Sequence, residues 1–319
     1  MGHDCGALIK AIDAYIAKAD NDLEDMLNAA GFAEAKDSIE SITNIEELVV
    51  AALKAETKHI LDSLDETLDL HAYARDVWPG VVLDDKLAEQ LQQIFIDEFT
   101  SLMPGLVNTY IAKIDNELVA LAISQRTTDW ITSWSKDLGE LMQLKSHAQI
   151  EDILTSGLST GQSIADITRA ILDSGIRDEY YRARTVAVTE VLRAHSVAEQ
   201  EALMQCPVAV EKEWLHTGAH KNTPRENHVA MSGQRVPVGE PFTLTGINGV
   251  YYPLYPRDIC LPPEEAIGCH CIHRGVASEL ILGLPVEERR ALQQQAIDED
   301  DSLWRSELDA ANRAKAGIE

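Results

Sequence analysis

Basic residues are scarce in this sequence. The 319 residues contain 27 Lys and Arg against 53 Asp and Glu, which gives a formal net charge of −26 at pH 7. Such a chain repels phosphate backbones and anionic membrane surfaces, because its net charge has the same sign as theirs. A nucleic-acid coating role is therefore disfavoured, and we expect little direct affinity for DNA.

Long hydrophobic runs are also missing. The longest clearly apolar run covers residues 48–53, whereas a helix that crosses a bilayer needs about 20 apolar residues. The first residues, Met-Gly-His-Asp-Cys, do not form a basic region followed by an apolar stretch, so no signal peptide is expected. The sequence predicts a protein that has no contact with membranes and stays in the compartment where it is made.

Cysteine is infrequent, and the five cysteines are an odd number, which argues against a disulfide scaffold. Common catalytic patterns are absent as well: G-x-x-x-x-G-K-[ST], H-E-x-x-H, G-x-S-x-G, G-x-G-x-x-G, and the deaminase pair H-x-E and P-C-x-x-C. His195 has no evident nucleophile partner, so a structural role is favoured for it. We therefore predict that the protein is not an enzyme.

Proline is rare in the first 205 residues, where only Pro79 and Pro104 occur. Apolar residues in this region recur at spacings of three and four, which is typical of amphipathic helices. Two such stripes are Leu87, Leu91, Ile94 and Phe95, and Ile111, Ile114, Leu118 and Leu121. The region is therefore predicted to be helical, with apolar stripes that are available for docking on a partner.

Local signals predict where these helices begin and break. The segment Trp78-Pro79-Gly80 predicts a break, and Met103-Pro104-Gly105 a second break or kink. Residues 41–44 are typical of a helix cap, and another helix is predicted to begin near Ser163. A further long helix is predicted over about residues 178–204.

Residues 206–280 differ in composition from the rest of the chain. They contain eight of the 11 prolines, seven glycines, five of the ten histidines and four of the five cysteines. Short strands are predicted over 208–214, 235–238, 242–244 and 250–252, and Asn248-Gly249 predicts a hairpin. The fold class is thus α+β: a mainly helical N-terminal two-thirds, a small β-rich module, and a C-terminal helix.

The cysteines of this module are spaced for metal binding. Cys269 and Cys271 flank one residue, so on a strand both sulfurs share a face with Cα atoms about 7 Å apart, and both can reach one ion. Cys260 lies nine residues before Cys269 and can return to the same place through the turn at residues 261–263. We predict a structural zinc ion, because a module with so little core gains most from a metal.

The fourth zinc ligand is expected to be a histidine. His228 is favoured because it comes from a separate segment, while His216 and His220 are its competitors. His273 shares a face with the two thiols, but a straight strand puts it about 13 Å from Cys269. Two other interpretations of the cysteines are buried thiols packed as small apolar groups and a redox pair, and the latter is disfavoured because an i, i+2 disulfide closes a strained ring.

The order of elements resembles a known family. A helix rich in arginine is followed by a Lys-x-Trp strand, a histidine shortly before a glycine, and a closing Cys-x-Cys segment. The residues concerned are Arg182-Ala183-Arg184-Thr185, Thr189-Glu190-Val191-Leu192-Arg193-Ala194, Lys212-Glu213-Trp214, His228, Ser232-Gly233, Glu240-Pro241-Phe242, Pro256-Arg257-Asp258 and Cys269-His270-Cys271. Over about residues 150–275 this pattern resembles the phage Mu F-like head morphogenesis family of minor capsid proteins, although Gly268 and His270 replace the Asn and Arg of its closing motif.

The resemblance implies a protein of low copy number in the head of a tailed phage or prophage. It would be made in the bacterial host cytoplasm and lie in the capsid interior near the portal vertex. Its partners would be the portal protein and the major capsid or scaffolding protein, and it would support head assembly, DNA packaging or ejection. An acidic chain fits this place, because it can lie beside packaged DNA without being captured by it.

The resemblance also implies a division of the chain. Residues 1–150 form a variable helical region, 151–205 the helical core of the family-like domain, 206–280 the β-rich Cys/His module, and 281–319 an acidic helical tail. Two other functions stay open. One is a metal-dependent nuclease or toxin-like enzyme, although few residues follow the Cys-x-Cys segment. The other is a cytoplasmic zinc-binding adaptor without a link to phages.

Overall fold

The structure of the protein is a computed structural model that describes residues 21–217 and 224–298. The chain divides into two compact units, each built from separate stretches of sequence. The mixed unit comprises Met1–Ile42, Leu102–Gln125 and Thr189–Glu319, and the helical unit comprises Thr43–Ser101 and Arg126–Val188. Each unit therefore draws on several of the segments predicted from the sequence.

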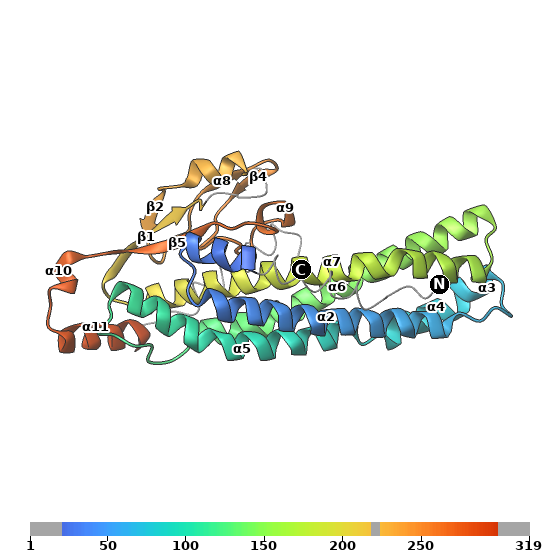
Figure 1. Cartoon of the computed structure of the whole chain (residues 1–319), viewed down its shortest axis with the longest axis horizontal. Coiled ribbons are helices and arrows are strands. Elements are labelled where there is room, and N and C mark those ends of the chain that lie inside the picture. Colours follow the sequence, from blue (N-terminus) through green and yellow to red (C-terminus); the bar gives the residue numbers. More distant parts are fainter. Residues whose placement is uncertain (1–20, 218–223, 299–319) are drawn as a thin grey trace, which may run out of the picture. The chain divides into compact units, whose positions relative to one another are not determined.

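Three long helices contribute residues to both units: α2 (Ala35–Ser63), α5 (Leu87–Ile114) and α7 (Ile164–Gln205). The helical unit adds α3 (Leu70–Ala72), the π-helical turn η1 (Tyr73–Val77), α4 (Trp78–Asp84) and nearly all of α6 (Gln125–Thr160). Within this unit the parts of α2, α5, α6 and α7 lie side by side (Figure 1). The prediction of an α+β protein with a mainly helical first part is confirmed.

The interior of the helical unit is largely apolar. One cluster of buried side chains, near α3 and α4, is formed by Ile60, Leu70, Tyr73, Trp78, Val81, Leu154, Ile164, Ile167 and Ile171. Helices α5 and α6 approach each other closely at Gly139, where a Cβ atom would lie only 2.5 Å from the carbonyl oxygen of Ala88. In the predicted stripe, Leu87, Leu91 and Phe95 are buried and Ile94 is half-buried, so the stripe packs within the chain itself.

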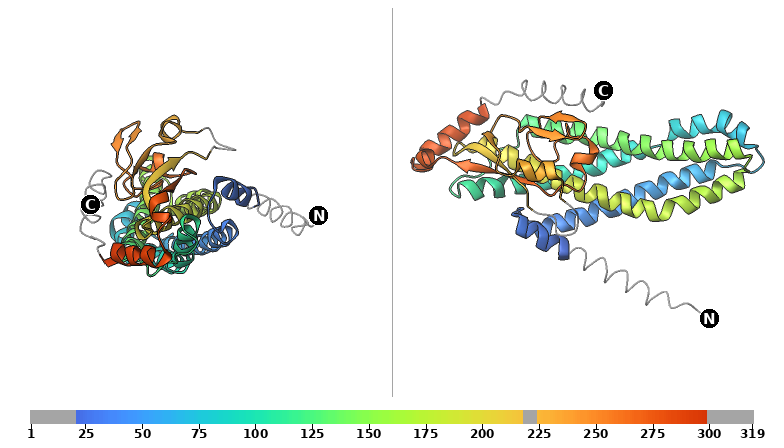
Figure 2. Two further views of the ribbon diagram at one scale, coloured as in Figure 1. Left: turned by 90° about the vertical axis from the view of Figure 1, so that its left-hand side faces the viewer. Right: turned by 90° about the horizontal axis from the view of Figure 1, so that it is seen from above.

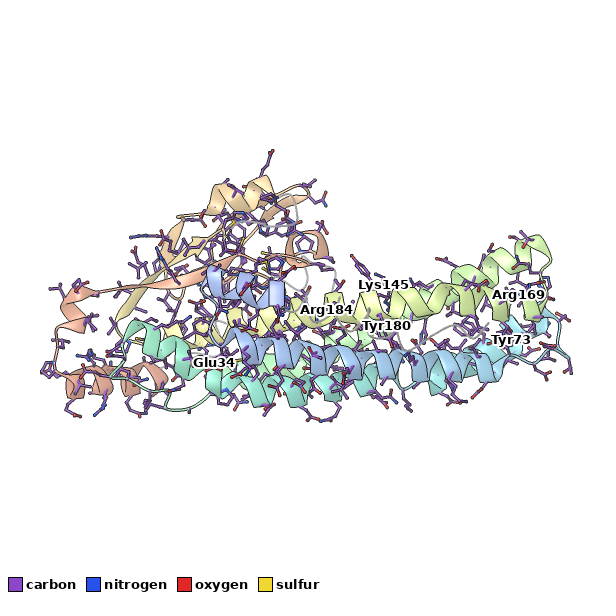
Figure 3. All side chains as sticks on the ribbon, viewed as in Figure 1. Glu34, Tyr73, Lys145, Arg169, Tyr180 and Arg184 are labelled. Carbon is purple, nitrogen blue, oxygen red and sulfur yellow. The ribbon has the colours of Figure 1, made fainter. Side chains whose placement is uncertain are left out.

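Polar contacts join α7 to α2 within the helical unit. Tyr180 and Arg184 lie one turn apart on α7 (Figure 3). Lys54 of α2 donates a hydrogen bond to the Tyr180 hydroxyl at 2.9 Å, and Arg184 forms an ion pair with Glu46 at 3.0 Å. Arg184 is thus neutralised by an acidic side chain of a neighbouring helix.

The mixed unit contains a three-stranded antiparallel sheet with the strand order β2-β1-β5. Its strands are β1 (Ala209–Leu215), β2 (Arg235–Pro237) and β5 (Ile272–Ala277). Strands β3 (Leu244–Gly246) and β4 (Gly249–Tyr251) form a separate hairpin. The hairpin is the one predicted at Asn248-Gly249, but Gly246 pairs with Gly249, so the two turn residues are Ile247 and Asn248.

Short helices complete the mixed unit: α8 (Glu226–Met231), α9 (Pro263–Ala266), α10 (Glu279–Leu282) and the C-terminal α11 (Val286–Asp298). Figure 2 gives two further views of the sheet and of these helices. A buried cluster joins the sheet to α8, α9 and the hairpin, and its members are Trp214, Met231, Phe242, Leu244, Cys260, Leu261, Ala266, Cys269 and Cys271. The cysteines therefore lie in the core of the β-rich part.

Several predicted helix boundaries are wrong. Residues 41–44 lie inside α2, because burial of Ile42, Ile45 and Val49 at helical spacing outweighs the capping preference of the polar residues between them. Pro104 lies inside α5, and the helix continues because Met103 and Leu106 are fully buried on either side of it.

Two other helix signals have mixed outcomes. Pro79 and Gly80 lie in the first turn of α4, where proline is tolerated, and helical structure precedes them, so the chain does not break there. The predicted start near Ser163 is confirmed, since its hydroxyl accepts the Asp166 N–H at 3.2 Å and the Asp166 carboxylate accepts the Ser163 N–H at 3.1 Å. The helix that begins there runs without interruption to Gln205 and includes the predicted 178–204 helix. Across the described part of the chain, every helix is too short or too polar to span a bilayer.

Candidate metal centre

Three potential metal ligands converge in the core of the mixed unit. His228 of α8 meets Cys269 and Cys271, which lie in the extended segment before β5. The His228 Nδ1 atom lies 3.5 Å from Cys269 Sγ and 3.6 Å from Cys271 Sγ. On a tetrahedral zinc ion with bonds of about 2.3 Å to sulfur and about 2.0 Å to nitrogen, sulfur and nitrogen ligands lie about 3.5 Å apart. The spacing of these atoms fits that geometry.

The backbone before β5 brings both thiols to the same place. Helix α9 ends at Ala266, and Gly268 follows in a left-handed conformation with φ of 66°, which glycine adopts without strain. The chain then becomes extended, so the side chains at positions 269 and 271 point to the same face. The strand geometry predicted for the Cys-x-Cys pair therefore brings both sulfurs to His228, although β5 itself begins one residue later.

Arg257 fixes the backbone of the two cysteines from inside the core. Its side chain is 1% exposed, and its Nη1 donates hydrogen bonds to the carbonyl oxygens of Cys269 and Cys271, both at 2.8 Å. The second terminal nitrogen donates to the Ser196 hydroxyl at 2.6 Å. Arg257 has a positive φ of 63°, which is unusual for a residue with a side chain. This conformation is held by the contacts of the guanidinium group.

The far side of the His228 ring is held by a buried carboxylate. His228 Nε2 lies 2.9 Å from Glu265 Oε2, and Glu265 is 2% exposed. The Asn227 side chain donates hydrogen bonds to both oxygens of Glu265, at 3.0 and 3.1 Å. A histidine that binds a metal commonly donates its other N–H to a carboxylate, which fixes the ring and its tautomer. Glu265 therefore leaves Nδ1 free to face the two thiols.

The two thiols are electrostatically unequal. The hydrogen bond that Cys271 donates to Cys269 lowers the pKa of Cys269 well below its ordinary value and raises that of Cys271. Burial opposes ionisation of both groups, while His228 and Arg257 favour the thiolate of Cys269. Thiolates are the form in which cysteine binds metals, so this environment favours a cation beside the sulfurs.

The other predicted ligands lie in different places. Cys260 is 3% exposed in the same buried cluster, but it is outside the group of three. His216 is also outside this group, but its Nδ1 lies 3.5 Å from Cys271 Sγ. His273 is fully buried on β5 and faces Glu199, whose carboxylate is 3.9 Å away, and His220 lies outside the described residues.

Sequence reasoning missed the supporting groups of this centre. Glu265 and Asn227 are not part of any spacing pattern, since their role depends on how α8 and α9 meet. Arg257 was identified only as part of a Pro-Arg-Asp turn. The neighbouring residues carry a signal for the role of Arg257, because two turn-forming prolines and an aspartate lie near this charged residue in a Cys-rich segment.

The residues that carry the family resemblance form a buried polar network. Lys212 is fully buried, and its Nζ donates to Gln200 Oε1 at 3.0 Å and to the carbonyl oxygen of Leu254 at 2.8 Å. Arg193 pairs with Glu190 at 2.9 Å and also donates to the carbonyl oxygen of Arg257. These side chains support the backbone around the metal centre, because each satisfies a polar group that the fold removes from water.

His195 occupies a structural position, as expected from its isolation in the sequence. It is 1% exposed and lies between the Ser38 hydroxyl at 2.7 Å and the Tyr110 hydroxyl at 2.9 Å. Burial, together with the positive charges of Arg257 and Lys113, lowers the pKa of His195 to about 3. A histidine held neutral in this way joins helices of the mixed unit by hydrogen bonds.

Comparison with known proteins supports the family resemblance that the order of these elements indicated. Residues 148–274 match the family described as Phage Mu protein F like protein, nearly the range over which the resemblance was predicted. The chain is also 31% identical over 298 residues to the uncharacterized protein YqbB of Bacillus subtilis (strain 168), a match that covers 91% of this chain and 97% of that protein. No solved structure gives a significant match. The chain therefore belongs to the Phage Mu protein F like family, which indicates a phage head morphogenesis protein.

Proposed function

We propose that this protein is a minor head protein that binds the portal protein inside the capsid of a tailed phage or prophage. It acts without catalysis, is present in few copies, and supports head assembly, DNA packaging or ejection. The observation that carries the proposal is the family match over residues 148–274, which includes the candidate metal centre and the whole of α7. The family is one of structural head-morphogenesis proteins, which favours a structural role for this chain.

We also propose that His228, Cys269 and Cys271 hold a structural zinc ion, with His216 as the fourth ligand. The contact between His216 Nδ1 and Cys271 Sγ has the same 3.5 Å length as that between His228 and Cys269. Cys260, which the sequence predicted as a ligand together with His228, Cys269 and Cys271, is the alternative to His216. With four protein ligands the site is closed, and the ion stabilises the fold without binding a substrate.

The metal would compensate for the small core of the β-rich part. Strand β2 has only three residues, and β3 and β4 also have three each. Strands of this length bury little apolar surface, so the free energy gained by burial offsets only part of the entropy lost when their backbone is ordered. An ion that joins α8 to the segment before β5 adds folding free energy directly.

The portal contact in this proposal uses exposed side chains of the helical unit. Most members of the two predicted apolar stripes are buried within the chain and not available to a partner, while Leu121, in the mixed unit, is 47% exposed. The large apolar side chains of this unit that remain exposed include Leu83 of α4 at 80% and Leu144 of α6 at 64%. Apolar residues in such positions are suitable anchors for a protein partner.

Incorporation into heads tests the portal proposal. Phage heads would be assembled with full-length chains carrying Leu83→Glu with Leu144→Glu, and the copies per head would be measured by quantitative mass spectrometry. Incorporation should fall sharply, while Ile247→Glu at the 91% exposed hairpin turn of the mixed unit serves as the matched control and should have no effect. Unchanged incorporation of the double variant, or loss in the control alone, would refute the assignment to the helical unit.

Metal analysis tests the zinc proposal and its fourth ligand. Protein purified without chelator should contain zinc, and Cys269→Ser should remove it. His216→Ala should weaken zinc binding more than Cys260→Ala if His216 is the fourth ligand, and the reverse result would assign Cys260. A nuclease assay on the same preparations addresses the enzymatic alternative, because a fourth position occupied by water instead of protein would leave a site for metal-assisted hydrolysis.

A further inference from the structure

A second group of potential ligands lies in the helical unit. Glu56 of α2, Asp85 of the connection between α4 and α5, and His147 of α6 bring ligand atoms to within 4.8 Å of one another. The side chains of Asp85 and His147 are 4% and 11% exposed, and Glu56 is 6% exposed. These residues are far apart in the sequence and follow no spacing motif, so only the fold reveals the group.

Neighbouring contacts hold each member of the group in place. The Asp85 Oδ1 atom accepts the backbone N–H of Leu87 at 2.9 Å, which leaves Oδ2 to face His147 Nε2 at 2.6 Å. The Trp78 indole packs against the edge of the His147 ring, with centroids 6.0 Å apart. Ser146 donates a hydrogen bond to Glu56 Oε2 at 2.9 Å. Hydrogen bonds and packing from neighbouring residues thus hold the three side chains in position, as is common for metal ligands.

Helix α6 directs the two relevant side chains inward. Lys145 is exposed, and Figure 3 shows it pointing away from the helices. The next two residues, Ser146 and His147, are 5% and 8% exposed. Polar side chains at two successive buried positions of a helix are uncommon in an apolar interior. Ser146 contacts Glu56 and His147 contacts Asp85, so both polar side chains face the same group.

The donor atoms of the group suit a divalent cation. Two carboxylates and one imidazole bring oxygen and nitrogen atoms to within 4.8 Å of one another, with little contact with water. A divalent transition metal ion binds carboxylate oxygens and an imidazole nitrogen together.

A pocket borders the group and gives it access to solvent. Its volume is about 230 Å³, and Glu56, Ser146 and Arg182 form part of its wall. Arg182 donates hydrogen bonds to Ser146 Oγ at 3.4 Å and Gln149 Oε1 at 3.3 Å. The pocket therefore leads to the group at Glu56, next to a positively charged side chain. An ion can enter there, and water molecules can complete its coordination shell.

We propose that Glu56, Asp85 and His147 bind a divalent first-row transition metal ion such as Mn²⁺. One imidazole nitrogen with two carboxylate oxygens forms a mixed N/O site, and the absence of a sulfur ligand in this group favours Mn²⁺ over the ions that thiolates select. An ion about 2.1 Å from His147 and Asp85 needs their facing atoms to separate from 2.6 Å to about 3 Å, which small side-chain rotations provide. The ion would connect α2, the α4–α5 connection and α6. This site is independent of the zinc centre and of the portal proposal.

Manganese binding to the full-length chain tests the proposal. The protein would be stripped of metal with a chelator and titrated with Mn²⁺, and bound Mn²⁺ would be measured by electron paramagnetic resonance. We expect one bound ion in the wild type and in the double variant Cys269→Ser with Cys271→Ser, which lacks the thiolates. The variants Asp85→Asn and His147→Gln should weaken binding by about tenfold or more. Asp84→Asn is the matched control, because Asp84 is an exposed acid next to Asp85 and should leave binding unchanged.

A measurement on the unaltered protein keeps the test decisive if a variant fails to fold. Pulsed electron paramagnetic resonance of the wild-type chain with bound Mn²⁺ should detect coupling to one imidazole nitrogen. Absence of Mn²⁺ binding in the wild type overturns the proposal, and so does bound Mn²⁺ without nitrogen coupling. Equal losses in Asp84→Asn and Asp85→Asn would also overturn it, because binding would then depend on surface charge. Loss of zinc from the thiolate variant without loss of Mn²⁺ separates this result from the fate of the zinc centre.

Discussion

The two units of this protein differ in how completely they bury charged side chains. The helical unit buries apolar residues of long helices, such as Leu91, Phe95 and Phe99, which are all fully buried. The mixed unit buries charged side chains with the same completeness, including Lys212 at 0% and Arg257 at 1%. Apolar packing tolerates changes of shape, whereas a buried charge requires its particular partners. We therefore expect the mixed unit to be more sensitive to single substitutions than the helical unit.

The largest effect should come from removing a thiol of the metal centre. Under the zinc proposal, Cys269→Ser releases the ion and opens the mixed unit before the helical unit, because metal binding contributes folding free energy. Hydrogen exchange read by mass spectrometry should show lost protection in β1 and β5 but not in α6. Cys206→Ser is the matched control, since Cys206 is 2% exposed but lies outside the ligand group. Equal exchange in both variants would contradict the role of the metal.

The next largest effect should come from Arg257. Arg257→Met removes the donors to the carbonyl oxygens of Cys269 and Cys271 and leaves both acceptors buried. We expect a loss of about 3 kcal/mol or more in the free energy of unfolding, measured with urea. Arg235→Met is the control, because that side chain is 51% exposed and its ion pair with Glu213 is worth about 1 kcal/mol or less. A loss for Arg257→Met as small as that of the control would weaken the contrast between the units.

A substitution in the helical unit probes whether its packing is as tolerant as proposed. Gly139→Ala places a Cβ atom 2.5 Å from the Ala88 carbonyl oxygen, so α5 and α6 must separate, at a cost of about 1–3 kcal/mol. At Gly80 of α4 an added Cβ meets no heavy atom of the described chain within 4 Å. Gly80→Ala should therefore be neutral or stabilising by up to about 1 kcal/mol. Similar thermal unfolding temperatures for the two variants would show that the close approach is easily relieved.

A smaller effect concerns the pH dependence of the mixed unit. Burial lowers the pKa of His195 to about 3 in the folded protein, whereas an unfolded histidine takes up a proton near its ordinary pKa of 6.5. The contribution of His195 to stability is therefore fully present above pH 6.5 and is lost as pH falls from 6.5 towards 3. Between pH 6.5 and 5 this group alone should remove roughly 2 kcal/mol. Urea unfolding of His195→Gln should show a weaker dependence on pH over this interval, and an equal dependence would assign the effect to other groups.

The smallest expected signal is DNA binding by either unit. Three arginines of α7 have acidic or polar partners: Arg193 pairs with Glu190, Arg184 with Glu46, and Arg182 contacts Gln149. Non-specific affinity depends on clustered cations that displace counterions from phosphates. In a gel-shift assay at 150 mM salt the protein should not bind duplex DNA with a dissociation constant below about 1 μM. Tighter binding would revive the nuclease alternative.

The fold class could be predicted because helices and short strands leave different periodic patterns. Composition separated residues 206–280 from the rest, and strands β1, β2 and β4 formed close to the predicted positions. Helix boundaries could not be predicted equally well. Burial of Ile42 and Ile45 and of Met103 and Leu106 is decided by tertiary contacts, which override local signals of capping and breaking.

The candidate metal centre could be predicted only in part. The i, i+2 spacing of Cys269 and Cys271 has a geometric meaning on an extended segment, and His228 was favoured because it belongs to another segment. The distance from Cys260 to the others depends on the path of the chain through the turn at residues 261–263, which spacing does not determine. The group of Glu56, Asp85 and His147 lay beyond sequence reasoning altogether, because its members are joined only by helix packing.

The interleaving of the two units has a consequence for the order in which the chain folds. Contacts of the mixed unit join residues that are synthesised far apart: Ser38 with His195, separated by 157 residues, and Asp115 with Arg289, separated by 174. Such contacts form late, since a long loop must close before they contribute. On the ribosome, the N-terminal end of α2 and the C-terminal end of α5 therefore keep apolar surface uncovered until the later segments of the mixed unit have been synthesised. The newly made chain should accordingly depend on chaperones, or on prompt capture by its assembly partner, more than its final content of helix implies.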